Sequence, residues 1–408
     1  MTGPDLSIAV ARRELGALAG GRDDEATIAA YARTIWSVLT EPGDRIAGTL
    51  VRTHGAAAAL ELAASGRADG ALDEAGVSAE ELAAGRRRWH PRLGGVATAL
   101  ANARRAGVHL IVPGDPPWPC RADDLGPFAP LCLWVRGDPA ALDTAPAAVA
   151  IVGSRAATGY GEHVAAELGA DAAGAGHVVY SGAAYGIDAA AHRAVLAAGG
   201  PTVAVMAGGI ERPYPAGHAD LLNRIAATGA VIAEVACGTA PTRHRFLARN
   251  RLIAALSDAT VVVEAGWRSG ALNTAHHAQA LGRPVGVVPG PITSASSMGC
   301  HRLLREGDAV CITGIDDVRD LLGVQEGADA RGVRSADTGG EYTGERTRIL
   351  DALSVRSART VGEVARRAGF APEEAAALLG LLELEGRAAR TPSGWVRPAR
   401  AETAGGIP

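Results

Sequence analysis

The chain has 408 residues, of which 48% are hydrophobic, and a formal net charge of −4 at pH 7. This length suits two or three domains with sizeable cores. The sequence contains no lysine, which excludes a Walker A phosphate loop, a Schiff-base lysine and a serine–lysine catalytic pair. All fixed positive charge is therefore guanidinium, which suits bidentate contacts to phosphate or carboxylate. The overall charge does not indicate a nucleic-acid binder, although it leaves room for a local basic groove.

The five cysteines are widely spaced and form no C-x-x-C motif. Their pattern argues against a disulfide framework or a zinc site and favours a reducing compartment. The N-terminus has no basic segment leading into an apolar one, and no stretch is long and apolar enough to span a membrane. We therefore expect a cytoplasmic protein without membrane contact.

Residues 24–107 have the apolar spacing of helices, with hydrophobic side chains three and four positions apart. The link Glu41-Pro42-Gly43-Asp44 predicts the end of one helix and the start of the next, because Pro and Gly break helices and Asp is a good N-cap. Short helices with tight turns predict a helix-hairpin or SAM-like module. We interpret it as a packing or interaction domain without chemistry of its own.

Residues 108–322 are predicted to form an α/β domain. A Pro-rich entry segment with two short strands leads into seven apolar runs, each followed by an Ala/Leu-rich helical pattern: AVAIVG, HVVYSG, TVAVMAG, AVIAEV, TVVVEAG, PVGVVPG and AVCIT. Near-continuous apolar strands joined by helices indicate a parallel sheet that is covered on both faces. Because such crossovers are right-handed, we predict a doubly wound, Rossmann-like parallel sheet.

The C-terminal region divides into a linker and a small module. Residues 323–343 lose apolar periodicity and are rich in Gly, Asp and Ser, which predicts a flexible linker. Residues 344–399 predict a winged helix, with Thr360 and Glu363 as a capping box and a hairpin containing Trp395. Its predicted recognition helix, APEEAAALLGLLELEG, is acidic and aliphatic and would repel phosphate, which favours a role other than DNA binding.

In an open parallel sheet, ligands bind at the carboxyl ends of the strands, where the strand order reverses. Glycine and hydroxyl residues recur at these ends: Gly153, Ser154 and Arg155 after the first strand, Ser181 and Gly182 after the second, Gly238 after the fourth, and Ser269 and Gly270 after the fifth. Each set precedes a predicted helix, whose first N–H groups have no partner within the helix. A row of such sites would suit the phosphates of a polynucleotide.

Residues 241–254 contain four arginines and no acidic residue. Arg243, Arg245, Arg249 and Arg251 surround Phe246 and Asn250. Guanidinium groups beside an aromatic ring are typical of single-stranded nucleic-acid sites, where cations contact phosphates and rings stack on bases. The alternative is a solvated basic helix face with Phe246 in the core. The sequence alone leaves both interpretations open.

The sequence does not assemble a catalytic site. Asp188 and His192 lie four residues apart on a predicted helix, but the pair lacks the third ligand of a metal site. We interpret Asp188 as a cap or loop anchor and His192 as a packing residue. Glu264 ends a strand, where a ribose-binding or catalytic role and a structural role are both open. We predict no catalytic residue, no metal and no cofactor.

Four central segments resemble the DNA-processing protein A family, also called DprA or Smf. They are AIVGSRAATGYG, SGAAYGIDAAAHRAVLAAGGPTVAVMAGGIERPYP, FLARNRLIAALSDATVVVEAGWRSGALNTA and VVPGPITSASSMGCHRLLREGDAV. The resemblance covers the whole central domain with its motifs in order, and extends to the entry segment. The helical module and the winged helix resemble the family's usual extensions more loosely.

This resemblance implies a recombination mediator without enzymatic activity. Such a protein binds and protects single-stranded DNA, acts as a homodimer, and helps to load RecA recombinase during recombination or natural transformation. By motif, Arg155 and the stretch from Phe246 through Arg249, Asn250 and Arg251 would line the DNA groove. Ser181, Gly182, Gly238, Ser269 and Gly270 would add backbone or hydroxyl contacts.

The sequence departs from the family pattern at three positions. Tyr185 replaces a frequent basic residue, His276 a frequent arginine and His301 an expected asparagine. These changes lower the positive charge of the groove, and Tyr185 offers a stacking surface instead.

Two other functions remain as alternatives. A nucleotide-derivative hydrolase of the lysine-decarboxylase-like group would share this Rossmann variant, but its P-G-G-x-G-T-x-x-E motif is absent. A dinucleotide-dependent oxidoreductase would need G-x-G-x-x-G and a ribose-binding acid about 20 residues further on, and the sequence provides neither.

Overall fold

The computed structural model describes residues 4–65, 71–142, 147–307, 309–323, 344–355 and 357–398. The chain forms two compact units, residues 1–325 and residues 326–408. The predicted linker, 323–343, lies outside the described residues except for its first position. No helix of the described chain is long and apolar enough to cross a membrane.

The first unit begins with short helices. They are α1 (Ile8–Leu15), α2 (Asp24–Leu39), α3 (Arg45–His54), α4 (Ala56–Ser65), α5 (Ala71–Ala75), α6 (Ala79–Trp89) and α7 (Val96–Ala106). The predicted break between α2 and α3 is confirmed, because the Asp44 side chain accepts hydrogen bonds from Ile46 N and Ala47 N. Ser78 and Glu81 form a capping box at the start of α6.

A mixed sheet of nine strands follows within the described residues. The strands are β1 (His109–Ile111), β2 (Leu133–Gly137), β3 (Ala148–Val152), β4 (Val178–Ser181), β5 (Thr202–Met206), β6 (Ala230–Ala233), β7 (Ala259–Val262), β8 (Val285–Val287) and β9 (Val310–Cys311). Their order is β1-β2-β6-β5-β4-β3-β7-β8-β9. The two entry strands pair antiparallel, and the remaining seven are parallel. The predicted doubly wound sheet is confirmed.

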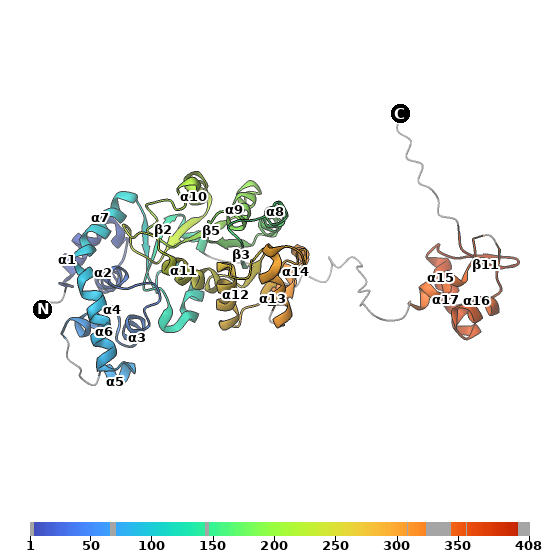
Figure 1. Ribbon diagram of the computed structural model, residues 1–408, viewed down its shortest axis with the longest axis horizontal. Coiled ribbons are helices and arrows are strands. Elements are labelled where there is room, and N and C mark those ends of the chain that lie inside the picture. Colours follow the sequence, from blue (N-terminus) through green and yellow to red (C-terminus); the bar gives the residue numbers. More distant parts are fainter. Residues whose placement is uncertain are drawn as a thin grey trace, which may run out of the picture. The chain divides into compact units, whose positions relative to one another are not determined.

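Helices cover both faces of the parallel strands (Figure 1). They are α8 (Gly159–Gly174), α9 (Ile187–Ala197), α10 (Ala219–Thr228), α11 (Arg243–Ala255), α12 (Gly270–Ala280), α13 (Met298–Glu306) and α14 (Ile315–Leu321). Successive residues of β3 point to opposite faces: Ala150 packs with α11 and α12, and Ile151 with α8 and α9. This burial on both sides explains why the strands are apolar without alternation.

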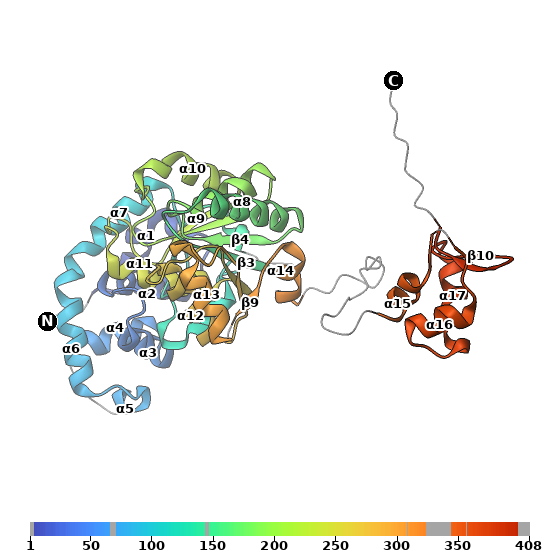
Figure 2. The same cartoon turned by 45° about the vertical axis from the view of Figure 1, so that its right-hand side comes forward.

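The N-terminal helices share their core with the sheet. One continuous cluster joins residues of α1 to α7 with Trp134 of β2 and Leu222 of α10. Trp36 packs edge to face on Trp89 with ring centroids 5.0 Å apart, and Trp134 Nε1 donates to Ser37 Oγ at 3.2 Å. Figure 2 shows these helices at the end of the sheet away from α14. The predicted domain boundary at residues 107 and 108 stays a prediction.

The second unit contains α15 (Glu345–Ala352), α16 (Val361–Ala368), α17 (Pro372–Leu384), β10 (Ala389–Thr391) and β11 (Gly394–Val396). The predicted capping box of Thr360 and Glu363 starts α16. Leu379 and Trp395 are buried in its core. The recognition helix α17 contains no arginine and exposes Leu381 and Leu384.

Helix α3 approaches the entry segment so closely that Gly48 has no room for a side chain. A Cβ at this position would clash with the backbone carbonyl of Pro127. We therefore expect Gly48→Ala to destabilise the first unit by about 1–3 kcal/mol through overpacking, measured as a lower urea midpoint by tryptophan fluorescence. Gly94→Ala, whose Cβ would meet nothing within 4 Å, is the control. An unchanged midpoint for Gly48→Ala would contradict this packing.

His192 on α9 is the packing residue predicted from the sequence. It is fully buried, and its Nδ1 lies 2.7 Å from Thr202 Oγ1, whose own hydrogen is donated to Val179 O. The ring therefore donates from Nδ1. Burial lowers the pKa of His192 to about 3, with the charges of Arg249 and His218 acting in the same direction.

This pKa predicts a measurable loss of stability in acid. Below the ordinary histidine pKa of about 6.5 the unfolded chain binds a proton that the folded chain refuses until about pH 3. The free energy of unfolding should therefore fall by up to about 1.4 kcal/mol per pH unit as the pH drops through this window. His192→Gln should flatten the dependence, measured by urea unfolding from pH 7 to 4.5, and the exposed His276→Gln should not. Parallel pH profiles for wild type and His192→Gln would refute the assignment.

Candidate nucleic-acid interface

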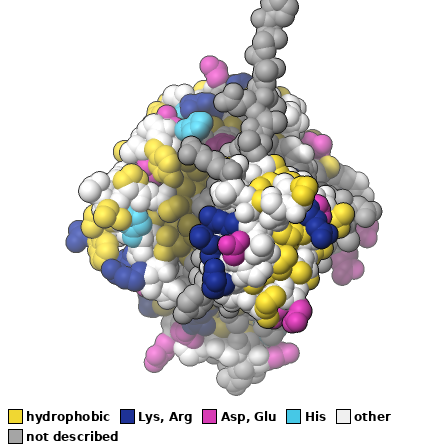
Figure 3. Space-filling model, turned by 90° about the vertical axis from the view of Figure 1, so that its right-hand side faces the viewer, with side chains coloured by type: hydrophobic (Ala, Val, Ile, Leu, Met, Phe, Trp, Pro, Cys, Tyr) yellow, Lys and Arg dark blue, Asp and Glu magenta, His cyan; other side chains and the backbone are white. Residues whose placement is uncertain are grey.

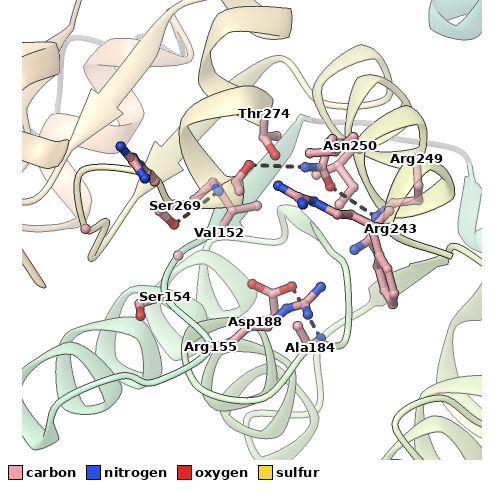
Figure 4. Close-up of a pocket in the computed structure, with 18 of the residues that line it drawn as sticks. Val152, Ser154, Arg155, Ala184, Asp188, Arg243, Arg249, Asn250, Ser269 and Thr274 are labelled. Carbon is pink, nitrogen blue, oxygen red and sulfur yellow. Dashed lines mark hydrogen bonds between the residues drawn. The ribbon is translucent and has the colours of Figure 1, made fainter.

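The strand order reverses between β3 and β7. From β3 the chain builds β4, β5 and β6 on one side, and then returns to place β7, β8 and β9 on the other. The loops after β3 and β7 therefore diverge and leave a crevice at the carboxyl edge of the sheet. A cleft of about 780 Å³ opens there. It brings together nine of the predicted site residues: Gly153, Ser154, Arg155, Arg243, Phe246, Arg249, Asn250, Ser269 and Gly270 (Figure 4).

Buried Glu264 fixes the loop after β3. Its backbone oxygen accepts from Ser154 N at 2.7 Å, and its carboxylate accepts from Thr158 N at 2.9 Å and Thr158 Oγ1 at 2.6 Å. Of the two roles left open for Glu264, these contacts support the structural one. The loop presents Arg155 in an exposed position, with its guanidinium carbon 4.7 Å from the centroid of the Phe246 ring.

Helix α11 supplies the opposite wall. Thr242 caps its start by accepting from Arg245 N. Arg249 is 5% exposed and donates to Gly182 O at 2.9 Å and to Val205 O, and its guanidinium carbon lies 5.8 Å from the Phe246 centroid. Burial lowers the pKa of Arg249 to about 10, so its guanidinium remains charged at neutral pH. Phe246 thus contacts two guanidinium groups.

Asp188 is the only carboxylate among the described residues that line the cleft. It is buried, and its Oδ2 accepts from Gly182 N at 3.1 Å and from Ala184 N at 3.3 Å. Burial raises the pKa of the Asp188 carboxyl above its ordinary value, against the opposing effect of the Arg249 charge and of backbone N–H donors. These contacts match the expected role of a loop anchor.

Asn250 joins α11 to α12, and Ser269 lies at the start of α12. Asn250 Nδ2 donates to Gly270 O at 3.1 Å, and its Oδ1 accepts from Arg249 Nε at 3.3 Å. Ser269 caps α12 by accepting from Ala271 N. Both side chains therefore stabilise the backbone around the cleft, and the N-terminus of α12 lies at the cleft.

Four predicted site residues do not line the cleft. Ser181 is fully buried and donates to Ile151 O at 2.6 Å, while Gly182 N–H is used by Asp188. Gly238 N donates to Glu211 Oε1 at 2.7 Å, and Arg251 forms an ion pair with Glu234 at 2.6 Å. Direct ligand contacts by Ser181, Gly182, Gly238 and Arg251 stay predictions that this geometry does not favour.

Carboxylates from distant parts of the chain reduce the positive charge of α11. Glu41, in the link between α2 and α3, accepts from Arg245 Nε at 2.9 Å and from an Arg245 terminal nitrogen at 2.8 Å. Burial opposes ionisation of Glu41, but hydrogen bonds from Arg245 and Arg92 lower its pKa overall. Among the described residues that line the cleft, the exposed cations are Arg155, Arg243 and Arg268. Figure 3 colours arginine side chains dark blue and acidic side chains magenta, and both kinds are visible on the face that it shows.

Three cleft residues with aromatic or cationic side chains are not among the predicted site residues. Trp267 and Arg268 lie in the loop after β7, and Tyr214 lies after β5 with its ring 5.5 Å from that of Phe246. For Trp267 and Arg268 the sequence signal is the motif W-R-S-G, an aromatic residue beside an arginine in a loop that follows a strand.

The three departures from the family pattern lie elsewhere. Tyr185 packs edge-on against His218 at 4.5 Å, and His301 Nε2 contacts Gly290 O at 2.9 Å. His276 is exposed on α12. None of the three is among the described residues that line the cleft.

Comparisons with known proteins identify the same family for both units. The model of DNA recombination-mediator protein A matches residues 109–323, and that of the DprA winged helix domain matches residues 334–394. A putative DNA processing protein DprA from Mycobacterium tuberculosis is 48% identical over 299 residues, which is 70% of this chain and 75% of the relative. Protein Smf from Escherichia coli is 34% identical over 304 residues, 72% of this chain and 78% of the relative.

A solved structure agrees with these matches. The X-ray structure of DNA processing protein A from Streptococcus pneumoniae aligns with a TM-score of 0.58 and 28% identity, covering 73% of this chain and 98% of that chain. The predicted Rossmann-like fold and winged helix are thereby confirmed. The family model spans more than half of the chain, and a relative 48% identical covers 70% of it; the chain therefore belongs to the DNA recombination-mediator protein A family, also known as DprA or Smf.

Proposed function

We propose that the cleft at the β3/β7 switch point binds single-stranded DNA, as part of the recombination-mediator role of this family. The observation that carries the proposal is the stack of Arg155 on Phe246, with Arg249 behind it, in a cleft where the single carboxylate among the described lining residues is buried. Guanidinium groups beside an aromatic ring can contact phosphate while the ring contacts a base.

The supporting chemistry separates into two kinds of contact. Exposed Arg155, Arg243 and Arg268 supply charge for phosphates. The N-termini of α11 and α12 add backbone N–H groups and the positive end of each helix dipole. Phe246 supplies a ring for a base. A neutral small ligand would not need three cations in one cleft.

From family membership we also propose the partners. The bound strand would be handed to RecA recombinase, with this protein acting as a homodimer and without a catalytic step of its own. RecA-dependent strand pairing on a long oligonucleotide should become faster when this protein is added, and sedimentation should give twice the chain mass. A monomer in sedimentation would refute the homodimer, and an unchanged rate of RecA-dependent pairing would refute the RecA assignment. Neither result would decide whether the cleft binds DNA.

Arg155→Ala tests the phosphate contact. The variant should bind fluorescent oligo-dT about 10-fold more weakly, because a charge-assisted contact is lost. The slope of log affinity against log salt concentration should fall by about 0.7, since one fewer counterion is released from the single strand. Fluorescence anisotropy at 50–300 mM salt measures both values.

Arg193→Ala is the matched control, because Arg193 is an exposed arginine of α9 that does not line the cleft. It should leave affinity and slope unchanged. Wild-type affinity and slope in Arg155→Ala would refute the phosphate assignment. If the wild type binds no oligo-dT even at low salt, the DNA proposal itself fails, and release of free base from nucleoside monophosphates becomes the next assay.

A further inference from the structure

Exposed aromatic side chains concentrate at the carboxyl edge of the sheet. The chain has only 6 Trp, 6 Tyr and 3 Phe. Among the described residues, those with strongly exposed rings are Phe128, Tyr160, Tyr185, Tyr214 and Trp267. All but Phe128 follow a parallel strand, namely β3, β4, β5 and β7. Large aromatics are usually well buried, so their exposure at one edge calls for a ligand or a structural reason.

Two of these rings have a structural reason. The Tyr160 hydroxyl donates to Pro289 O at 2.7 Å, which braces the loop after β8. Tyr185 packs against His218, which in turn contacts Ala183 O at 2.9 Å. Tyr214 and Trp267 differ from them, because both line the cleft.

Trp267 is held from one side by a cation. The Arg302 guanidinium carbon, from α13, lies 5.3 Å from the Trp267 ring centroid, and Arg302 is itself paired with Glu306 at 3.4 Å. This contact fixes the indole in the loop after β7. The ring nevertheless remains 50% exposed on the cleft, where a flat partner can cover it.

Tyr214 extends the wall formed by Phe246. Their ring centroids are 5.5 Å apart with planes tilted by 50°. Tyr214 follows β5 and Trp267 follows β7, and these strands lie on opposite sides of β3 in the sheet. The cleft therefore has an aromatic side chain on each flank of the switch point, with Arg155 at the loop between them.

We propose that Trp267 and Tyr214 are base-stacking platforms, which take up unpaired bases on the two flanks of the cleft while the arginines contact the intervening phosphates. This inference rests on the proposed function. Stacking on an aromatic ring contributes about 5- to 150-fold in affinity per base and tolerates any sequence, because every base has a π-face. Bases inside a duplex cannot reach such platforms, so the pair selects single strands.

The two contributions respond differently to salt. Phosphate contacts release counterions and set the salt slope, whereas stacking releases none. Trp267→Ala should therefore weaken binding of oligo-dT about 5- to 150-fold with an unchanged salt slope. The same variant should bind an equally long oligonucleotide with abasic sites, which keeps the phosphates and lacks the bases, as well as the wild type does. Tyr214→Leu should behave in the same way.

Matched variants separate stacking from structure. Trp267→Phe keeps a ring and should recover most of the lost affinity for oligo-dT. Phe128→Ala removes an exposed ring that does not line the cleft. It should leave the affinity for both oligonucleotides unchanged. Thermal midpoints measured in parallel identify any variant that fails to fold. If Trp267→Ala fails to fold, the affinities of Trp267→Phe and of the wild type for oligo-dT are compared instead.

Three outcomes would overturn the proposal or its basis. If the wild type binds oligo-dT and the abasic strand equally well, no base stacks, although the DNA-binding function stands. If Trp267→Ala lowers the affinity for both ligands alike, or lowers the salt slope, then Trp267 acts by positioning other residues of the cleft or by contacting phosphates. If the wild type binds neither ligand, the proposed function has failed and this inference falls with it.

Discussion

The buried guanidinium of Arg249 is the contact on which the cleft depends. It donates to Gly182 O, just after β4, and to Val205 O, near the carboxyl end of β5, and so fixes α11 against the carboxyl edge of the sheet. A buried cation is costly unless its donors are satisfied; here carbonyl oxygens and the field of Asp188 compensate it. Phe246 lies one helical turn earlier and is thereby held under Arg155. Truncating Arg249 would leave two buried carbonyls without this donor and release the wall that carries the aromatic ring.

The N-terminal helices belong to the same frame. Glu41, between α2 and α3, neutralises Arg245 on α11, and Glu234 after β6 neutralises Arg251. Carboxylates therefore neutralise two of the four arginines that make α11 basic in sequence. This explains how a chain with a net charge of −4 keeps a small cationic surface: the charge is local, on Arg155, Arg243 and Arg268. The recognition helix α17, with Glu373 and Glu374 in its first turn and no arginine, adds none.

The fold was predictable because its signals are local. Apolar β-branched runs of four or five residues gave the parallel strands, and Asp44 and Thr360 marked helix starts through their own side chains. The position of the cleft was also predictable, since parallel strands bring their carboxyl ends together. The contacts that a residue makes with distant parts of the chain were not predictable. Arg251 finds Glu234, and Ser181 finds Ile151 on the neighbouring strand, through pairings that no local pattern encodes. Trp267 was missed because exposure depends on what packs around a ring, and here that is Arg302 from another helix.

The absence of lysine acquires a physical meaning in this site. A guanidinium is planar, so Arg155 can lie on the Phe246 ring and still direct N–H donors towards a phosphate, which a spherical ammonium group cannot do equally well. A guanidinium also keeps its charge under burial: the pKa of Arg249 falls only to about 10, whereas a buried lysine shifts far enough to lose its proton near neutral pH. A cleft that combines rings, burial and fixed positive charge is therefore better served by arginine than by lysine.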